Sequence, residues 1–294
     1  MSIQNRVETG DSAVHYDSSP TLFQLLLDKN MNYSSGIYMT GKEDLDQAQI
    51  LKMDRVAEIC GFQAGQTLLD MGCGWSGPAR YFAEHYQMNV IGYTLSDVQR
   101  DFAMKKAEER GIADRLDIRV CSVLDADLEP ESIDHVIFFE SIIHMWEKLD
   151  LFRLCHRALK PSGMLFVQES NYDRNSNTDK FREDRGFQLV DEVFGNTATM
   201  VSTGEMIRLM EEAEFLPCYS ENISNHYKRT LEQWCDRIDQ YREEMSAAEP
   251  GFFPGFRKYM MMALATYRLE GTVCHMTAGQ KTPNTWALRT KLKP

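Results

Sequence analysis

Features that define several protein classes are absent from this sequence. It has no run of the roughly 18 to 20 apolar residues that cross a bilayer. Its seven cysteines form no CxxC pair with zinc-like spacing, and no other metal-ligand cluster appears, so no metal is expected. The odd cysteine count and the lack of a signal peptide predict a reducing, cytoplasmic compartment.

Basic residues are also scarce. The 294 residues include 32 Lys and Arg against 44 Asp and Glu, for a formal net charge of -12. Proteins that bind nucleic acid or anionic membranes usually carry a basic patch, and none stands out here. We therefore expect a small-molecule partner, no nucleic acid and no stable membrane association, and we leave a homodimer open.

What the chain does have is a regular alternation of apolar runs and amphipathic segments. Such alternation indicates βαβ units, and so an α/β, Rossmann-like, mostly parallel sheet with helices on both faces. The predicted strands are 67–71, 89–93, 116–121, 133–139 and 164–168, with two more at 217–227 and 272–278. The predicted helices are 16–27, 46–60, 78–86, 97–110, 148–159, 203–214, 231–245 and 256–269.

A glycine-rich turn follows the first predicted strand, with Asp70 before it and Gly72, Gly74 and Gly77 within it. Ligands of open α/β sheets bind beyond the carboxyl ends of the strands, so this turn is a candidate binding loop. Its GxGxxG spacing leaves a dinucleotide open, as well as a tight turn without any ligand. However, Asp70 would repel a pyrophosphate and attract an ammonium group, which favours S-adenosylmethionine (SAM).

Residues 15–280 resemble the cyclopropane-fatty-acid and mycolic acid cyclopropane synthase branch of class I SAM-dependent methyltransferases. The matching pieces are Tyr33-Ser34, Leu69-Asp70-Met71-Gly72-Cys73-Gly74-Trp75, Gly92-Tyr93-Thr94-Leu95-Ser96 with Gln99, His226-Tyr227 with Thr230-Leu231 and Trp234, and Phe256-Arg257-Lys258-Tyr259. The resemblance implies a seven-stranded sheet, SAM as the methyl donor and an enzyme.

The resemblance also implies which residues hold SAM. Gly72 and Gly74 would lie against its methionine and ribose parts, and Tyr33 and Ser34 would close over the methionine end. The remaining expected contacts are Thr94, Leu95 and Gln99 at the ribose and adenosine, Val123 and Leu124 at the adenine, and Phe139 near the sulfonium. We expect a single domain: an N-terminal helical cap (1–52), the SAM-binding Rossmann-like core (53–170), a lid insertion (171–200) and the rest of the sheet with substrate-covering helices (201–294).

Departures from the family concern the base. Cyclopropane synthases hold a bicarbonate with a Cys, a Glu, a His and a Tyr, and we assign the corresponding positions to Ser35, Ile143, Gln168 and Tyr227. On that assignment only Tyr227 is kept, so ring closure on a lipid is not expected.

The segment from Glu140 to His144 instead resembles small-molecule methyltransferases. We interpret His144 as the base because a free imidazole titrates near neutral pH, with Glu140 and Tyr227 as its catalytic partners. Structural roles stay open for all three. The expected substrate residues are Tyr16, Glu169, Tyr172 and His226.

The 17 methionines and the aromatic residues of the cap and lid favour an apolar acceptor pocket. We expect methyl transfer to N, O or C of a small, apolar natural product, as in antibiotic biosynthesis and other secondary metabolism. The alternatives are C-methylation of a prenyl chain with coupled cyclisation, and cyclopropane formation on an unsaturated lipid.

Overall fold

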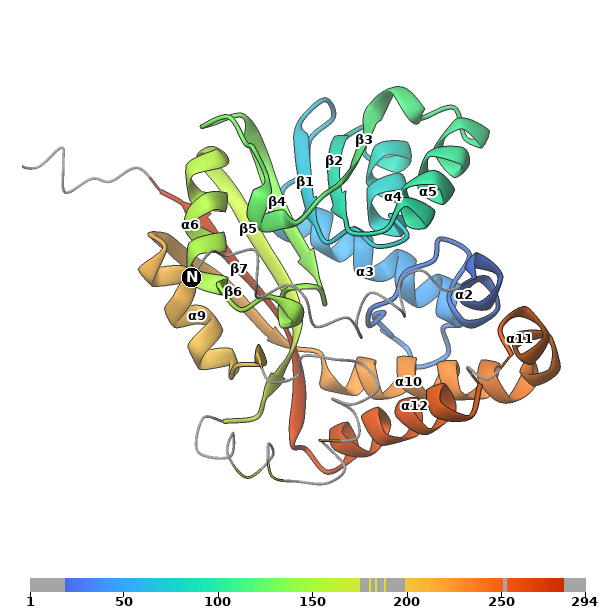
Figure 1. Cartoon of the computed structure of the whole chain (residues 1–294). Helices are drawn as coiled ribbons and strands as arrows, with labels where there is room; N and C mark the ends of the chain where they lie inside the picture. Colours follow the sequence, from blue (N-terminus) through green and yellow to red (C-terminus); the bar gives the residue numbers. More distant parts are fainter. Residues whose placement is uncertain are drawn as a thin grey trace, which may run out of the picture.

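The computed structural model describes residues 19–174, 199–250 and 253–282, together with residues 180, 183 and 188 (Figure 1). Its strands are β1 (Thr67–Met71), β2 (Asn89–Thr94), β3 (Leu116–Val120), β4 (Ile133–Phe139), β5 (Leu159–Tyr172), β6 (Phe215–Asn222) and β7 (Thr272–Lys281). Its α-helices are α2 (Pro20–Leu26), α3 (Leu45–Cys60), α4 (Gly77–His85), α5 (Asp97–Glu109), α6 (Lys148–Ala158), α9 (Thr203–Glu212), α10 (Ser224–Gln240), α11 (Arg242–Ala248) and α12 (Phe253–Arg268).

All seven strands form one sheet in the order β3-β2-β1-β4-β5-β7-β6. The pairs from β3 to β5 are parallel, and β7 runs antiparallel to both of its neighbours. The predicted seven-stranded, mostly parallel sheet is therefore confirmed. The order reverses between β1 and β4, so the crevice beyond their carboxyl ends is the place where such sheets bind ligands.

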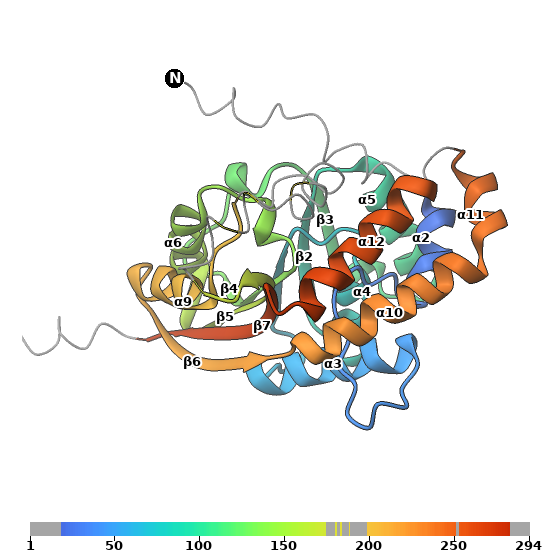
Figure 2. The same ribbon diagram turned by 90° about the horizontal axis from the view of Figure 1, so that it is seen from below.

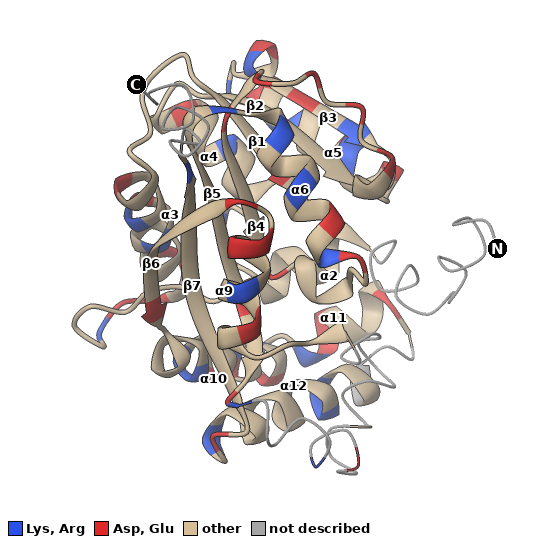
Figure 3. Cartoon of the chain, turned by 90° about the vertical axis from the view of Figure 1, so that its left-hand side faces the viewer, with Lys and Arg blue, Asp and Glu red and all other residues tan. Residues whose placement is uncertain are grey.

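Apolar side chains alternate between the two faces of the sheet. Leu68 belongs to a buried cluster supplied by α3, α4 and α5, and its neighbour Leu69 to another supplied by α6 and α9. This alternation follows from the twofold period of a strand and produces a three-layer arrangement. Basic and acidic residues are interspersed on the outer helices, as Figure 3 shows.

The end of the sheet that carries the site is covered by α2, α10 and α12. The helices α10 and α12 pack against each other, and α10 also contacts α2 (Figure 2). Within the described part of the chain, no helix has the length and apolar character that crossing a bilayer requires.

Helix starts follow their capping residues. Asp44 accepts a hydrogen bond from Gln47 N while the Gln47 side chain accepts one from Asp44 N, a capping box that starts α3. Ser202 caps α9 by accepting a hydrogen bond from Glu205 N. Ser96 caps α5 by accepting a hydrogen bond from Gln99 N.

Two predicted boundaries are wrong near the site. The strand predicted to 227 ends at Asn222, whose side chain accepts hydrogen bonds from the backbone N and Oγ of Ser224, the first residue of α10. His226 and Tyr227 therefore lie in the first turn of a helix. The fifth strand was predicted to begin at 164, but it begins at Leu159, directly after α6, and so includes Pro161 and Gly163. Most of the predicted lid, and Tyr16, lie outside the described residues.

Candidate functional site

The loop after β1 requires glycine at Gly72. Its φ of +89° is a conformation that L side chains avoid, and a Cβ there would lie 2.6 Å from Ser141 Cβ. Ser141 follows β4 and donates its hydroxyl to Met71 O at 2.6 Å. The loop after β1 is thus clamped to the turn after β4. In contrast, a Cβ at Gly74 would meet nothing within 4 Å, so this side of the loop is open.

Asp70 is the last buried acid before this loop. Its side chain is 1% exposed, and Oδ2 has no hydrogen-bond partner among the described residues. Burial raises the pKa of Asp70 to about 7, partly offset by the nearby Lys52 ammonium. An unpaired buried acceptor is costly, so a bound group that supplies donors would stabilise it. The ammonium of a SAM methionine moiety fits that requirement, whereas a pyrophosphate does not.

The expected adenosine contacts gather at the tips of β2 and β3. Thr94 Oγ1 donates to Gln99 Oε1 at 2.6 Å, which joins the end of β2 to the first turn of α5. Leu95 beside them is 66% exposed, an apolar side chain available to a ring. Val123 and Leu124 lie in a short 3-10 turn after β3. The arrangement suits an adenosine, and β2 lacks the acid that a dinucleotide ribose needs.

Tyr33 and Ser34 are held by α3 and the covering helices. The Tyr33 ring packs on Phe23 and Trp234, with centroids 5.6 and 5.3 Å apart. Ser34 Oγ accepts from Lys52 Nζ at 2.8 Å, and Ser34 O accepts from Gln49 Nε2 at 2.7 Å. These contacts hold the segment Tyr33–Ser34 against α3 and α10. We expect this segment to close over the methionine end of SAM.

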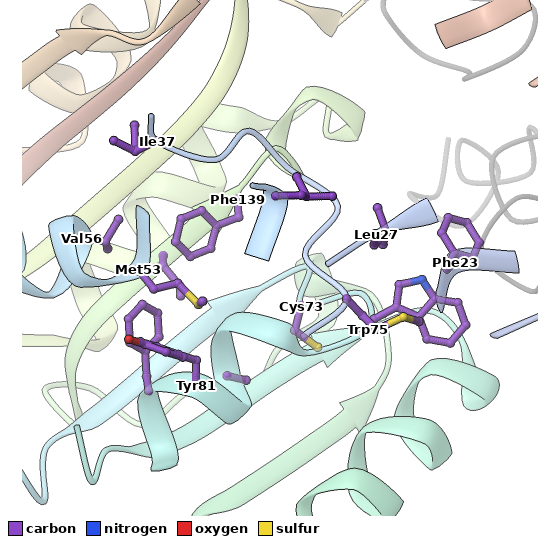
Figure 4. Close-up of a cluster of buried hydrophobic side chains, with 14 of the residues drawn as sticks. Phe23, Leu27, Ile37, Met53, Val56, Cys73, Trp75, Tyr81 and Phe139 are labelled. Carbon is purple, nitrogen blue, oxygen red and sulfur yellow. The ribbon is translucent and has the colours of Figure 1, made fainter. Parts of the chain in front are cut away.

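Lys52 is a site residue that the sequence analysis missed. It is fully buried on α3, and its ammonium lies 4.8 Å from the centroid of Phe139, the last residue of β4. Figure 4 shows Phe139 facing Met53, which like Lys52 lies on α3. Burial lowers the pKa of Lys52 to about 8, opposed by the carboxylates of Asp28, Glu140 and Asp70. A lysine between the apolar Ile50, Met53 and Val56 was the available signal.

Glu140 organises the second half of the site. It follows β4 with a φ of +54°, unusual for a residue with a side chain. Its Oε1 accepts from Ser35 N and from Gln168 Nε2, each at 2.8 Å, and the Tyr227 hydroxyl also hydrogen-bonds to the carboxylate. Burial raises the pKa of Glu140, while these three donors oppose the rise. Burial and the neighbouring Glu140 carboxylate raise the pKa of Tyr227.

This geometry corrects the assignment of Ile143. The side chains expected to surround the family's anion, Ser35, Gln168 and Tyr227, meet at Glu140 and not at Ile143. Ile143 lies one turn further on, where its N–H donates to Glu169. The carboxylate that we expected to be lost is present, and the clear departures from the family's set are Ser35 and Gln168.

Glu169 supports the turn that carries these groups. It is buried at the end of β5, and its two oxygens accept from Ile143 N at 2.9 Å and Ser170 N at 2.7 Å. Burial, and to a lesser extent the Glu140 carboxylate, raise the pKa of Glu169 to about 8. Its bonds go to backbone groups, which indicates a positioning role beside the substrate role expected for it.

The other expected residues are placed as follows. His144 ends the 3-10 turn Ile142–His144 and is half-buried, four residues after Glu140. His226 Nδ1 accepts from Tyr38 N at 3.1 Å and the two rings stack, so the His226 ring joins α10 to the segment between α2 and α3. Tyr172 is fully buried at the end of β5, and its N–H donates to Val201 O.

Tyr267 on α12 completes an aromatic wall that the sequence did not reveal. Its ring lies 4.7 Å from that of Tyr227, which in turn lies 6.2 Å from Trp234. Its hydroxyl lies 2.6 Å from Ser170 Oγ. No local pattern marks Tyr267, because its partners Tyr227 and Ser170 lie far away along the chain.

Comparison of the sequence with known proteins shows which family the chain is similar to. The family model described as mycolic acid cyclopropane synthetase matches residues 3–276. The cyclopropane mycolic acid synthase MmaA2 of Mycobacterium tuberculosis is 28% identical over 274 residues, covering 88% of this chain and 92% of its own. A probable fatty acid methyltransferase of Pseudomonas putida is 26% identical over 83% of this chain and 62% of its own.

Solved structures share the fold. The cyclopropane synthase MmaA2 from Mycobacterium tuberculosis superposes with a TM-score of 0.85 at 22% identity, covering 92% of this chain and 97% of its own. The [4+2]-cyclase SpnF superposes with a TM-score of 0.75 at 20% identity, covering 92% of this chain and 94% of its own.

Proposed function

The chain belongs to the mycolic acid cyclopropane synthetase family, a branch of the SAM-dependent methyltransferases, and we propose that it methylates a small-molecule acceptor without closing a ring on a lipid. Bound SAM supplies a methyl group that its sulfonium makes electrophilic. Asp70, Gly72, Gly74 and the segment Tyr33–Ser34 would hold it. Because the displacement is in line, the main task of the protein is to align donor and acceptor and to exclude water.

Gln168 is the observation that carries the proposal against ring closure. Its Nε2 donates to Glu140 Oε1 at 2.8 Å and to Ser35 O at 3.1 Å, so both amide hydrogens are used by the protein. Ser35 Oγ likewise donates to Gly36 O at 3.0 Å. A bicarbonate would need donors at these positions, and neither side chain has one to spare.

His144 is the base that we propose for an oxygen or nitrogen acceptor. It lies in the 3-10 turn past the tip of β4, four residues after Glu140, and a free imidazole has a pKa that suits proton removal near neutral pH. Glu140 and Tyr227 would orient the acceptor, joined by Glu169 and Tyr172 at the end of β5.

Replacing His144 with alanine is expected to lower kcat about 100-fold, since general-base catalysis typically contributes that much or more. The Kd of S-adenosylhomocysteine should stay within about twofold, because the donor residues lie on other loops. Steady-state kinetics with the acceptor and calorimetry with S-adenosylhomocysteine measure the two quantities. Parallel losses of both would show that His144 is structural.

Lys52 should set the pH range of donor binding. Lys52→Met removes the buried cation that favours ionised Asp70, so the pKa of Asp70 should rise further. The pH below which S-adenosylhomocysteine binding weakens should then move up by roughly one unit. Lys148→Met is the matched control, because the acids that face this buried lysine are Glu169 and Glu147. An unchanged profile in Lys52→Met would contradict the assignment.

A second candidate is C-methylation of a prenyl chain with coupled cyclisation. The wall formed by Tyr227, Tyr267 and Trp234 supports it, because aromatic faces stabilise a carbocation. The structural likeness to SpnF, a [4+2]-cyclase, is in keeping with this candidate but concerns the fold.

Radiolabelled SAM separates the candidates. The protein is incubated with a panel of small amines, phenols and prenyl alcohols, and separately with unsaturated phospholipid vesicles with and without bicarbonate. We expect label in a small molecule, with no dependence on bicarbonate. Bicarbonate-dependent label in the lipid would overturn the proposal and establish a cyclopropane synthase.

A further inference from the structure

Gln168 has a carbonyl oxygen that nothing in the described structure uses. Its Oε1 is buried and has no hydrogen-bond partner among the described residues, and the whole side chain is 0% exposed. Leaving a buried acceptor unpaired costs free energy that a ligand group can recover.

The orientation of this amide is fixed by its partners. Nε2 lies between two acceptors, Ser35 O and Glu140 Oε1. Turning the amide over would place Oε1 against both of these oxygens and lose both hydrogen bonds. Oε1 therefore has to face the other way, where it offers only lone pairs.

Register places this oxygen close to the methyl-donor site. Gln168 on β5 is paired with Phe139 on β4, and Phe139 is the residue expected near the sulfonium. Neighbouring strands lie about 4.8 Å apart. A group bound at Gln168 Oε1 would thus be one strand away from the expected position of the methyl group.

We propose that Gln168 Oε1, beside the Glu140 carboxylate, is a subsite for an N–H or O–H group of the methyl acceptor. The substrate class is accordingly an amine or an alcohol, and anions such as carboxylates or bicarbonate are excluded. This inference rests on the proposed methyl transfer and adds the group by which the acceptor is recognised.

The oxygens of Gln168 and Glu140 also explain why anionic acceptors are excluded. Glu140 Oε1 already accepts from two donors, and Gln168 Oε1 can only accept. An anion at this place would meet two acceptors without a hydrogen between them, which is unfavourable. An N–H or O–H group instead gives Gln168 Oε1 the donor that it lacks.

Four probes of one shape test the subsite: phenylethylamine, phenylethanol, phenylpropionate and ethylbenzene. Each is titrated by calorimetry into protein saturated with S-adenosylhomocysteine. The amine or the alcohol should bind at least about tenfold more tightly than phenylpropionate and ethylbenzene, as expected for a buried hydrogen bond. Whichever of the two binds more tightly identifies the donor as nitrogen or oxygen.

Gln168→Met removes the oxygen at similar volume and should reduce that preference to within about twofold. Gln168→His, which replaces the amide with the family's residue, should shift the preference toward phenylpropionate. Thr230→Val is the matched control, because Thr230 Oγ1 accepts from Gly36 N and so supports the same segment without touching Gln168. It should keep the wild-type preference.

Equal binding of phenylpropionate and the amine, no binding of any probe, or an unchanged preference in Gln168→Met and Gln168→His would overturn the inference. So would broadening of the carbon signal of labelled bicarbonate by the wild-type protein. Binding of S-adenosylhomocysteine is measured first on each sample. If S-adenosylhomocysteine binds and the probe test fails, only the subsite is contradicted. If S-adenosylhomocysteine does not bind, the proposed function is contradicted.

Discussion

Asp70→Asn is expected to weaken the binding of S-adenosylhomocysteine about 100-fold, or roughly 2.7 kcal/mol. The reason is that Asp70 Oδ2 is a buried acceptor without a partner, placed where the ammonium of the ligand would satisfy it. Charge-assisted hydrogen bonds in such surroundings are about twice as strong as neutral ones, and asparagine keeps the shape without the charge. Calorimetry at neutral pH measures the change directly.

The same carboxylate predicts a pH dependence. Burial raises the pKa of Asp70 to about 7, so Asp70 gains a proton as the pH falls through that value. Because the ammonium favours the ionised carboxylate, wild-type affinity should fall below about pH 7, and Asp70→Asn should lose this dependence.

Asp54→Asn is the matched control for Asp70→Asn. Asp54 accepts hydrogen bonds from the hydroxyls of Tyr81 and Tyr86, both at 2.8 Å, and so joins α3 to α4. The control should change stability but not the affinity for S-adenosylhomocysteine. If Asp54→Asn and Asp70→Asn weaken binding alike, the effect is one of folding and Asp70 has no direct role.

Among glycine-to-alanine substitutions in the loop after β1, Gly72→Ala should reduce stability and ligand binding the most. The residue needs a φ of +89°, and the added Cβ would lie 2.6 Å from Ser141 Cβ. Strain and overpacking together should lower the free energy of unfolding by about 3 kcal/mol. S-adenosylhomocysteine binding should also fall at least tenfold, because relief of the contact moves the loop away from the turn after β4.

Gly111→Ala isolates the cost of the backbone conformation. Gly111 follows Arg110, the C-cap of α5, with a φ of +69°, and a Cβ there would meet nothing within 4 Å. Its replacement should cost about 1 kcal/mol and leave ligand affinity unchanged. Denaturant unfolding and calorimetry on both variants give the comparison. Equal effects of the two substitutions on stability and binding would show that the close approach of Gly72 to Ser141 contributes to neither.

Local signals were sufficient for the scaffold of the site. The alternation of strand and helix, and the turn from Asp70 to Gly77, follow from periodicity and glycine placement, and the structure brings them together as predicted. These features were readable because each is a property of a few consecutive residues.

The centre of the acceptor site was not readable in the same way. Ser35 and Glu140 are 105 positions apart, and Glu140 and Gln168 are 28 apart, so only the folded sheet shows that they share hydrogen bonds. The positive φ of Glu140 turns its side chain in a way that no sequence pattern records. The assignment of the family's carboxylate to Ile143 therefore could be corrected only once these hydrogen bonds were seen.

The sequence did contain one overlooked signal. Lys52 lies on the apolar face of a predicted helix, and a charge at such a position indicates a buried partner. The surroundings of His226, in contrast, are set by the tertiary structure: its ring accepts a hydrogen bond from Tyr38 N, 188 positions away along the chain. The expected contact of His226 with the substrate stays a prediction.

The most direct test is calorimetric titration of the wild-type protein with S-adenosylhomocysteine and, separately, with NAD. If the crevice beyond β1 and β4 is a methyl-donor site, the first ligand binds with one site per chain and NAD gives no heat. A folded sample that binds NAD and ignores S-adenosylhomocysteine would contradict the assignment of Asp70 and the glycine loop, and the proposals for the acceptor site with it.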